Sequence, residues 1–169
     1  MADFGESQEA FCDLLETHRK IVIKVARAYC RSSHDVEDVM QEIVGQMWRS
    51  FPQYDGKRPF ATWAYRIALN VAISAMRSRL RHRSGFLDHE SIPEPACKSQ
   101  SPEMAAMVRE AFDVIDQFDA WDRALILLYL DDFSHAEIAE ILGISVTNVS
   151  TSLSRLRKRL ARKLESTNP

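Results

Sequence analysis

Helical periodicity runs through most of the sequence. Apolar residues recur at three- and four-residue spacing over most of the chain, and no convincing alternating strand pattern accompanies them. Such spacing places apolar side chains along one face of an α-helix, whereas a half-buried strand needs a period of two. The sequence therefore predicts an all-α protein.

Three helices are expected in the first half of the chain. One ends near the turn at residues 31–35, the next runs from that turn to just before Pro52, and the third spans about Phe60 to Arg81. The third is apolar nearly all round in its middle. It is therefore either packed on two sides or presents an aromatic edge to a partner.

A break in periodicity predicts two domains. Residues 83–101 contain Pro, Gly, Ser and charged residues without a helical period, so we expect a flexible linker there. We expect one small helical domain at residues 1–82 and a second at 102–169. In the second, Ser101 is placed to cap a helix whose first turn contains Pro102.

The stretch FSHAEIAEILGISVTNVSTSLSRLRKRL, residues 133–160, has the pattern of a helix-turn-helix. Ser134 and Glu137 form a capping box, Gly143 suits the turn, and Ser145 caps the following helix. The pattern favours DNA binding, with an ordinary helical hairpin as the alternative. A second helix in the major groove would present short uncharged side chains to the bases, with two arginines near phosphates. The candidates are Ser145, Thr147, Asn148, Ser150, Thr151, Ser152, Arg155 and Arg159.

Charge is distributed unevenly along the chain although the net charge is only -2. Residues 56–87 are basic without an acidic residue, residues 102–153 are mainly acidic, and residues 155–163 are basic again. The two basic zones are either phosphate-binding regions or solvated helix faces.

Other features exclude several classes of protein. The N-terminus has no secretory signal, and the longest apolar run, residues 124–130, is too short to cross a bilayer, so we expect a cytoplasmic protein without membrane insertion. Cys12, Cys30 and Cys97 form no CxxC pair. Cys30 and His34 share a helical spacing, but two ligands rarely make a metal site, and we expect no metal and no cofactor.

Several motifs in one order resemble a known family. DVEDVMQEI at 35–43, YDGKRPFATWAYRIALN at 54–70, the basic MRSRLRHR at 76–83, a linker and a C-terminal helix-turn-helix closely resemble the extracytoplasmic-function (ECF) sigma factors of RNA polymerase. The resemblance covers roughly residues 8–164. It implies a region 2-like domain before the linker, a region 4-like domain after it, and a factor without catalysis of its own.

The resemblance also implies roles for individual residues. The acidic helix would bind the clamp helices of core polymerase through Asp35, Glu37, Asp38, Gln41 and Glu42. The motif at residues 54–70 and the basic run at residues 76–83 would bind and melt the minus-ten element. That set comprises Tyr54, Lys57, Arg58, Phe60, Trp63, Asn70, Arg77, Arg79 and Arg81. Aromatic side chains suit melted DNA because every base has a flat face for stacking, although Phe60 and Trp63 are equally suited to the core.

The upstream element would be read by the helix-turn-helix, and the polymerase flap would hold that domain. Many members of the family are inhibited by an anti-sigma factor, so the resemblance implies such a partner. Two departures concern DNA recognition: Ser74 stands where the family often has Asp, and NVSTSL stands where it often has Lys and Arg.

Two rival functions remain at this point. A plain helix-turn-helix regulator would bind duplex DNA without polymerase, as a dimer on a palindromic site. An enzyme would use the carboxylates at 35–42 as acid, base or metal ligands, but they lack a His, a Gly-rich loop or a nucleophile to complete a site.

Overall fold

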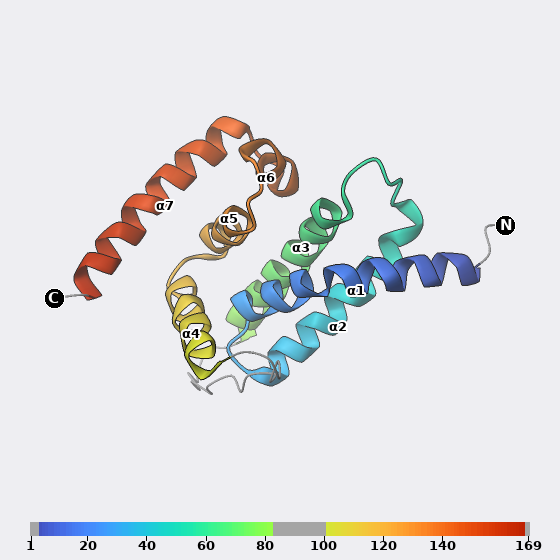
Figure 1. Cartoon of the computed structure of the whole chain (residues 1–169), viewed down its shortest axis with the longest axis horizontal. Helices are drawn as coiled ribbons and strands as arrows, with labels where there is room; N and C mark the ends of the chain where they lie inside the picture. Colours follow the sequence, from blue (N-terminus) through green and yellow to red (C-terminus); the bar gives the residue numbers. More distant parts are fainter. Residues whose placement is uncertain (1–3, 83–100, 168–169) are drawn as a thin grey trace. The chain divides into compact units, whose positions relative to one another are not determined.

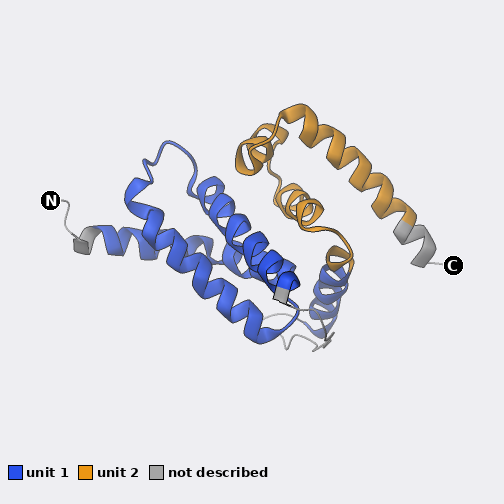
Figure 2. Ribbon diagram, turned by 180° about the vertical axis from the view of Figure 1, so that it is seen from behind, with its two compact units in different colours: residues 1–113 blue, residues 114–169 orange. Residues whose placement is uncertain are grey.

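A computed structural model describes residues 4–82 and 101–167 of the 169-residue chain. Within these two ranges every regular element is a helix, which confirms the predicted fold class (Figure 1). Contacts divide the chain into two compact units, residues 1–113 and 114–169 (Figure 2). The predicted linker, apart from Ser101, lies outside the described residues.

The first unit is built on three long helices that pack against one another. They are α1 (Phe4–Tyr29), α2 (Ser33–Ser50) and α3 (Phe60–His82), with a short 3-10 helix η1 (Phe51–Gln53) after α2. Their shared core includes Val25, Ile43, Met47, Tyr65 and Leu69. Because α3 contacts both α1 and α2, the two-sided packing predicted as one alternative for this helix is confirmed.

The remaining helices are α4 (Pro102–Asp116), α5 (Ala120–Leu130), α6 (His135–Leu142) and α7 (Val146–Thr167). The division between units falls at Asp113, inside α4. The sequence instead assigns all of α4 to the second domain, so the two boundaries differ by the first part of this helix. In the second unit α7 packs against α5 and α6, around a core that includes Leu125, Leu128, Ile138, Val149 and Leu153.

Side-chain caps begin α4, α5 and α6, and those at Ser101 and Ser134 are the ones that the sequence predicts. The Ser101 hydroxyl accepts a hydrogen bond from the Met104 N–H (3.3 Å), and the Asp119 carboxylate accepts from the N–H groups of Trp121 and Asp122. Ser134 and Glu137 form the capping box of α6, which ends at Gly143 with φ 69°. Glycine adopts this left-handed conformation without the steric cost that a Cβ brings. The helix-turn-helix prediction is therefore confirmed at the level of local structure.

The capping box makes the stability of the second unit depend on pH. Hydrogen bonds from the Ser134 hydroxyl and backbone N–H to the Glu137 carboxylate lower its pKa below the usual 4.5. Because the folded-state pKa is the lower one, this stabilisation is present above pH 4.5 and is lost as pH falls through the folded-state pKa. Glu137→Gln is expected to flatten the pH dependence of the unfolding free energy in that acidic range, as measured by urea denaturation at a series of pH values. Equal flattening by Glu9→Gln, an exposed change on α1, would contradict this cause.

Candidate partner-binding and nucleic-acid-binding surfaces

The acidic residues of α2 form a solvent-facing surface opposite its core face. Glu37, Asp38, Gln41 and Glu42 are exposed, whereas Val36, Val39, Ile43 and Met47 are buried on the other side of the helix. We call these four exposed residues the acidic face. Asp38 pairs with His34 (Oδ2 to Nδ1, 3.1 Å) and Glu42 with Arg49 (Oε1 to Nη2, 3.1 Å), both at the surface. Exposed ion pairs contribute little to stability, so these carboxylates can exchange their partners for cations of another molecule.

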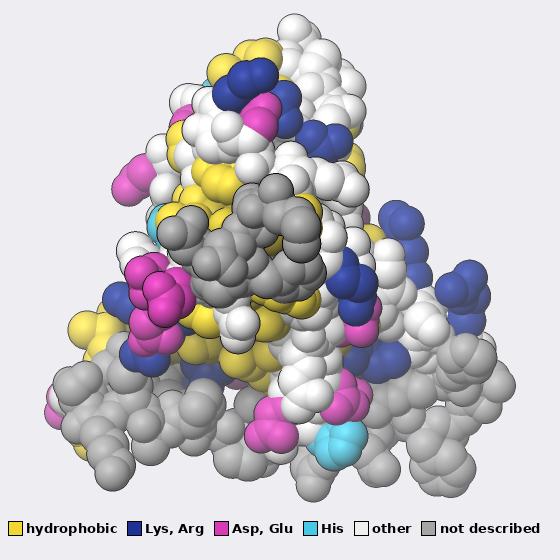
Figure 3. All heavy atoms as spheres, turned by 90° about the vertical axis from the view of Figure 1, so that its right-hand side faces the viewer, with side chains coloured by type: hydrophobic (Ala, Val, Ile, Leu, Met, Phe, Trp, Pro, Cys, Tyr) yellow, Lys and Arg dark blue, Asp and Glu magenta, His cyan; other side chains and the backbone are white. Residues whose placement is uncertain are grey.

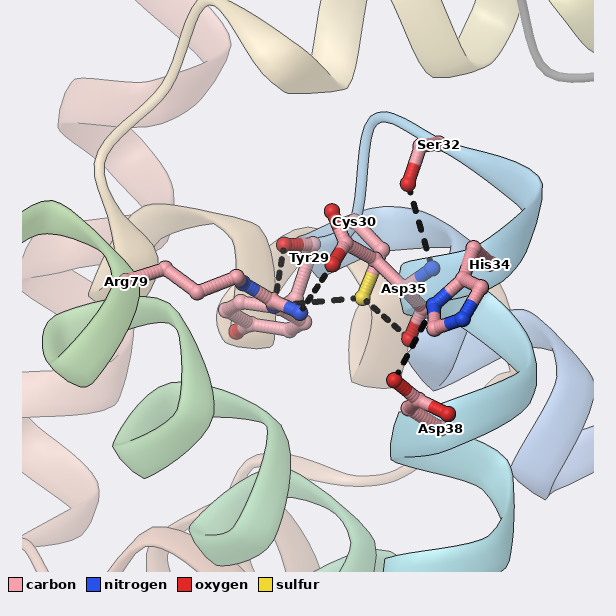
Figure 4. Close-up of polar contacts among 7 residues, drawn as sticks. All are labelled: Tyr29, Cys30, Ser32, His34, Asp35, Asp38 and Arg79. Carbon is pink, nitrogen blue, oxygen red and sulfur yellow. Dashed lines mark hydrogen bonds and ion pairs between the residues drawn. The ribbon is translucent and has the colours of Figure 1, made fainter. Parts of the chain in front are cut away.

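Asp35 differs from the rest of the predicted acidic set. Only 25% of its side chain is exposed, and its Oδ1 lies 3.5 Å from Nη1 of Arg79 on α3 (Figure 4). Asp35 and Arg79 were assigned by resemblance to two different partners, core polymerase and DNA. In the folded chain they contact each other, a relation that spacing along the sequence does not indicate.

An aromatic cluster connects the end of α2 to the start of α3. Ring centroids of Tyr54 lie 5.1 Å from Trp63 and 5.7 Å from Phe60, and Phe51 lies 6.1 Å from Tyr54. The Tyr54 hydroxyl donates a hydrogen bond to the Arg58 carbonyl (2.7 Å), which braces the loop that carries Lys57 and Arg58. Phe60 is only 5% exposed, which favours the core alternative for this residue, while Tyr54 and Trp63 are half-buried. Sequence reasoning missed Phe51 as a member of this cluster.

One exposed stripe runs along the solvent side of α3. It consists of Arg66, Asn70, Ser74, Arg77 and Arg81, and all five residues are exposed. Their spacing of four, four, three and four keeps them on one helical face. Arg66 was not among the predicted site residues, although its four-residue distance from Asn70 could have indicated it. The stripe combines fixed positive charge with an amide that can donate and accept hydrogen bonds.

The start of α7 carries the predicted base-reading residues, which are mostly exposed. Ser145 caps the helix by accepting from the Asn148 N–H (3.2 Å), and the Thr151 hydroxyl donates to the Thr147 carbonyl (2.9 Å). Ser150 contacts His135 of α6 (Oγ to Nδ1, 2.9 Å). Thr147, Asn148, Ser150 and Thr151 are exposed, whereas Ser152 is half-buried. The capping role predicted for Ser145 is thus confirmed.

The two predicted phosphate-binding arginines of α7 have different surroundings. Arg155 is exposed. Arg159 forms an ion pair with Asp122 of α5 and stacks over the Phe118 ring, with its guanidinium carbon 4.9 Å from the centroid. Arg157 similarly stacks on Tyr129 at 4.9 Å and donates to its hydroxyl. Arg157 and Arg159 therefore help to hold α7 against the preceding helices, which leaves Arg155 as the better-placed phosphate ligand.

No metal centre is found among the described residues, since no group of three or more His, Cys, Asp or Glu side chains converges there. Cys30 contacts Arg79 through its sulfur, whereas His34 pairs with Asp38, so the two residues share no partner among these contacts (Figure 4). Burial raises the pKa of the Cys30 thiol although Arg79 opposes the shift. Within the same residues, no helix is long and apolar enough to span a membrane.

The exposed faces of α2 and α3 differ in charge. Figure 3 shows a face on which basic, acidic and hydrophobic side chains all appear among the described residues. By contrast, the acidic face lies on one side of α2 and the stripe on one side of α3. A helical domain with a basic stripe, joined in sequence to a helix-turn-helix, is the arrangement of a DNA-binding transcription protein.

Comparison with known proteins identifies the family within this class. A model of sigma-70 region 2 matches residues 14–82, and a model of sigma-70 region 4 matches residues 122–160. The ECF RNA polymerase sigma factor SigW of Bacillus subtilis is 29% identical over 93% of this chain and 90% of its own length. The RNA polymerase sigma factor CnrH of Cupriavidus metallidurans is 28% identical over 95% of this chain and 89% of its own.

Two solved structures have the same fold. CnrH in complex with the cytosolic domain of CnrY matches with a TM-score of 0.66 and 26% identity, covering 94% of this chain and 90% of that one. RpoE of Bartonella quintana in complex with the anti-sigma factor NepR matches with a TM-score of 0.75 and 20% identity, covering 93% and 98%. The chain belongs to the ECF-type sigma factors, with sigma-70 regions 2 and 4. It is a non-enzymatic factor that directs promoter-specific transcription initiation by RNA polymerase.

Proposed function

We propose that the two domains divide promoter recognition between them. The acidic face of α2 binds the clamp helices of core polymerase, α3 and the aromatic cluster open the minus-ten element, and α7 reads the upstream element while the flap holds its domain. The observation that carries this proposal is the pair of opposed surface chemistries in the first unit: exposed carboxylates on α2 and an exposed basic and amide stripe on α3. Carboxylates suit a basic protein partner and repel DNA, so the two helices select different ligands.

Opening of the minus-ten element is proposed to occur by capture of unpaired bases. Stacking on a half-buried ring such as Trp63 is worth about 1–3 kcal/mol per base, and the backbone of the strand would follow Arg66, Arg77 and Arg81. Asn70 lies between these arginines on the stripe and has both donor and acceptor groups for a base edge. Phe60 acts from the core by fixing the ring of Trp63, whose centroid lies 5.1 Å away.

The upstream element is proposed to be read mainly by neutral side chains. Thr147, Asn148 and Thr151 are exposed at the start of α7 and suit hydrogen bonding and methyl contact with bases. The start of α7 carries no Lys or Arg before Arg155, and Arg159 is engaged by Asp122, so few cations lie near the base-reading residues and binding by the isolated domain should be weak. Attachment to the polymerase flap then raises the local concentration of this domain near the upstream element, which compensates for its weak binding to DNA.

An anti-sigma factor is a further proposed partner, because the solved CnrH and RpoE structures contain CnrY and NepR respectively. We assign the chain to the cytoplasm, where RNA polymerase acts.

The proposed division of labour is tested by run-off transcription. Purified protein added to core polymerase is expected to give discrete transcripts from a pool of genomic promoter fragments, and none without core. A regulator that acts alone would instead protect duplex DNA from nuclease without polymerase. Binding to core without any promoter-specific transcript would contradict the proposal.

A further inference from the structure

Arg79 reaches from α3 to the turn between α1 and α2. Its Nη2 donates to the Tyr29 carbonyl (3.3 Å) and lies 3.2 Å from Sγ of Cys30, while Nη1 lies 3.5 Å from Oδ1 of Asp35 (Figure 4). One guanidinium therefore contacts the last residue of α1, the residue after it and the first turn of α2. We call these four residues the Arg79 clamp.

The charges in the clamp are complementary. Tyr29 ends α1, so its carbonyl lies at the negative end of that helix, and Asp35 lies in the first turn of α2, near the positive end. Arg79 stands between a partial and a full negative charge. The Cys30 thiol, which burial keeps neutral by raising its pKa, donates in turn to the Asp35 carbonyl (3.5 Å), and the Ser32 hydroxyl accepts from the Asp35 N–H (3.1 Å).

Burial separates Arg79 from the exposed stripe of the same helix. Its side chain is 25% exposed, whereas Arg77 and Arg81 are exposed. A phosphate contact would require Arg79 to leave partly buried acceptors, which would then lose their hydrogen bonds. The three acceptors also match the planar fork of an arginine, whose donors diverge at fixed angles.

We propose that Arg79 is a positioning residue that fixes the first turn of α2 against α3, and thereby orients the acidic face for core polymerase, instead of binding DNA. This inference rests on the proposed role of the acidic face in binding core. The clamp joins the polymerase-binding helix to the DNA-binding helix within one domain.

Arg79→Lys distinguishes positioning from DNA contact. Lysine keeps the charge and serves well as a point-charge phosphate ligand, but it cannot hold three separate acceptors in fixed directions. A phosphate-binding Arg79 would thus tolerate the change, whereas the clamp would not. The companion variants are Arg79→Gln, Asp35→Asn and the double variant, with Arg19→Gln as a matched charge control on α1 at an exposed pair with Glu16.

The first measurement is amide hydrogen exchange in the protein alone. Arg79→Lys and Arg79→Gln are expected to increase exchange about tenfold at residues 36–40, with the rest of α2 unchanged. Unchanged rates in a folded Arg79→Lys protein overturn the clamp. This measurement needs no polymerase, so it tests the clamp independently of core binding. Failure of the wild-type protein to bind core would overturn the proposed function and leave the result for the clamp unaffected.

The second measurement compares affinity for core polymerase with the salt dependence of promoter binding by the holoenzyme. Arg79→Gln is expected to weaken core binding about tenfold, equivalent to about 1.4 kcal/mol, and the double variant with Asp35→Asn should lose no more than the larger single effect. The salt slope should stay unchanged, whereas Arg77→Gln should lower it by about 0.7–0.9. Normal core affinity with a lowered salt slope in Arg79→Gln would show a DNA contact and overturn the proposal.

Discussion

Arg123→Met is expected to destabilise the second unit by about 3 kcal/mol, because it removes the buried cation of a partly buried ion pair together with the hydrogen bonds that this cation donates. The Arg123 side chain is 6% exposed, and its Nη1 lies 2.9 Å from Oδ1 of Asp116. Its Nε donates to the Phe118 carbonyl (2.7 Å) and its Nη2 to the Asp116 carbonyl (2.6 Å). These contacts hold the end of α4 and the turn that follows against α5.

A loss of this size is large for a unit of 56 residues, 114–169, whose whole stability is expected to be about 3–8 kcal/mol. Amide hydrogen exchange of α5 to α7 in the full chain measures the loss of stability of the second unit separately from the first unit. Lys158→Met, an exposed change on α7 with the same loss of charge, is the matched control. Equal destabilisation by both variants would mean that net charge matters and that the contacts of Arg123 do not.

The consequence for function follows from the same contacts. A second unit that unfolds at working temperature cannot present α7 to the upstream element, while the first unit keeps its own core and its acidic face. Arg123→Met is therefore expected to reduce transcription from promoters that depend on the upstream element more than it reduces core binding. The effect is indirect, since Arg123 is buried and touches no proposed DNA-binding residue among the contacts described above.

Local features of the fold were predictable from the sequence. The capping box at Ser134 and Glu137, the left-handed Gly143 and the cap at Ser145 depend on residues within three or four positions of one another, so the chain reveals them directly. For the same reason, helical periodicity predicted the end of α1 and both ends of α2 and α3 to within a few residues. The exposed α2 carboxylates from Glu37 to Glu42 follow from the apolar stripe on the other side of that helix.

Contacts between distant charged residues were not predictable. Arg79 and Asp35 lie on different helices, and so do Arg159 and Asp122, and in both cases the sequence offers several charges of each sign at similar positions. Arg123 lies in the mainly acidic segment 102–153, and nothing in the sequence around it indicates that it is buried. Its burial depends on how α4 ends against α5, which is a property of tertiary packing. Charge counts predict which zones are basic, but not which cations are engaged inside the protein.

Asn70→Ala is expected to reduce open-complex formation tenfold or more, because an amide that pairs with a base edge contributes about 1–3 kcal/mol of discrimination. Asn70 is exposed between Arg66 and Arg77 on the stripe of α3. Alanine is a better helix former than asparagine, so the substitution should not weaken α3 itself. Permanganate reactivity of unpaired thymines measures opening, and a fluorescence titration with core polymerase measures docking.

The contrast between these two measurements decides the role of Asn70. Core binding should be unchanged, because the acidic face lies on α2 and the Asn70 side chain lies on the solvent side of α3. Ser74→Ala, one turn further along the same stripe, is the matched control, and its smaller hydroxyl should matter less for opening. A template with the minus-ten region already unpaired should recover only part of the lost transcription, since base capture, and not only strand separation, is impaired. An equal loss of core binding and of opening would instead assign Asn70 a structural role in the domain.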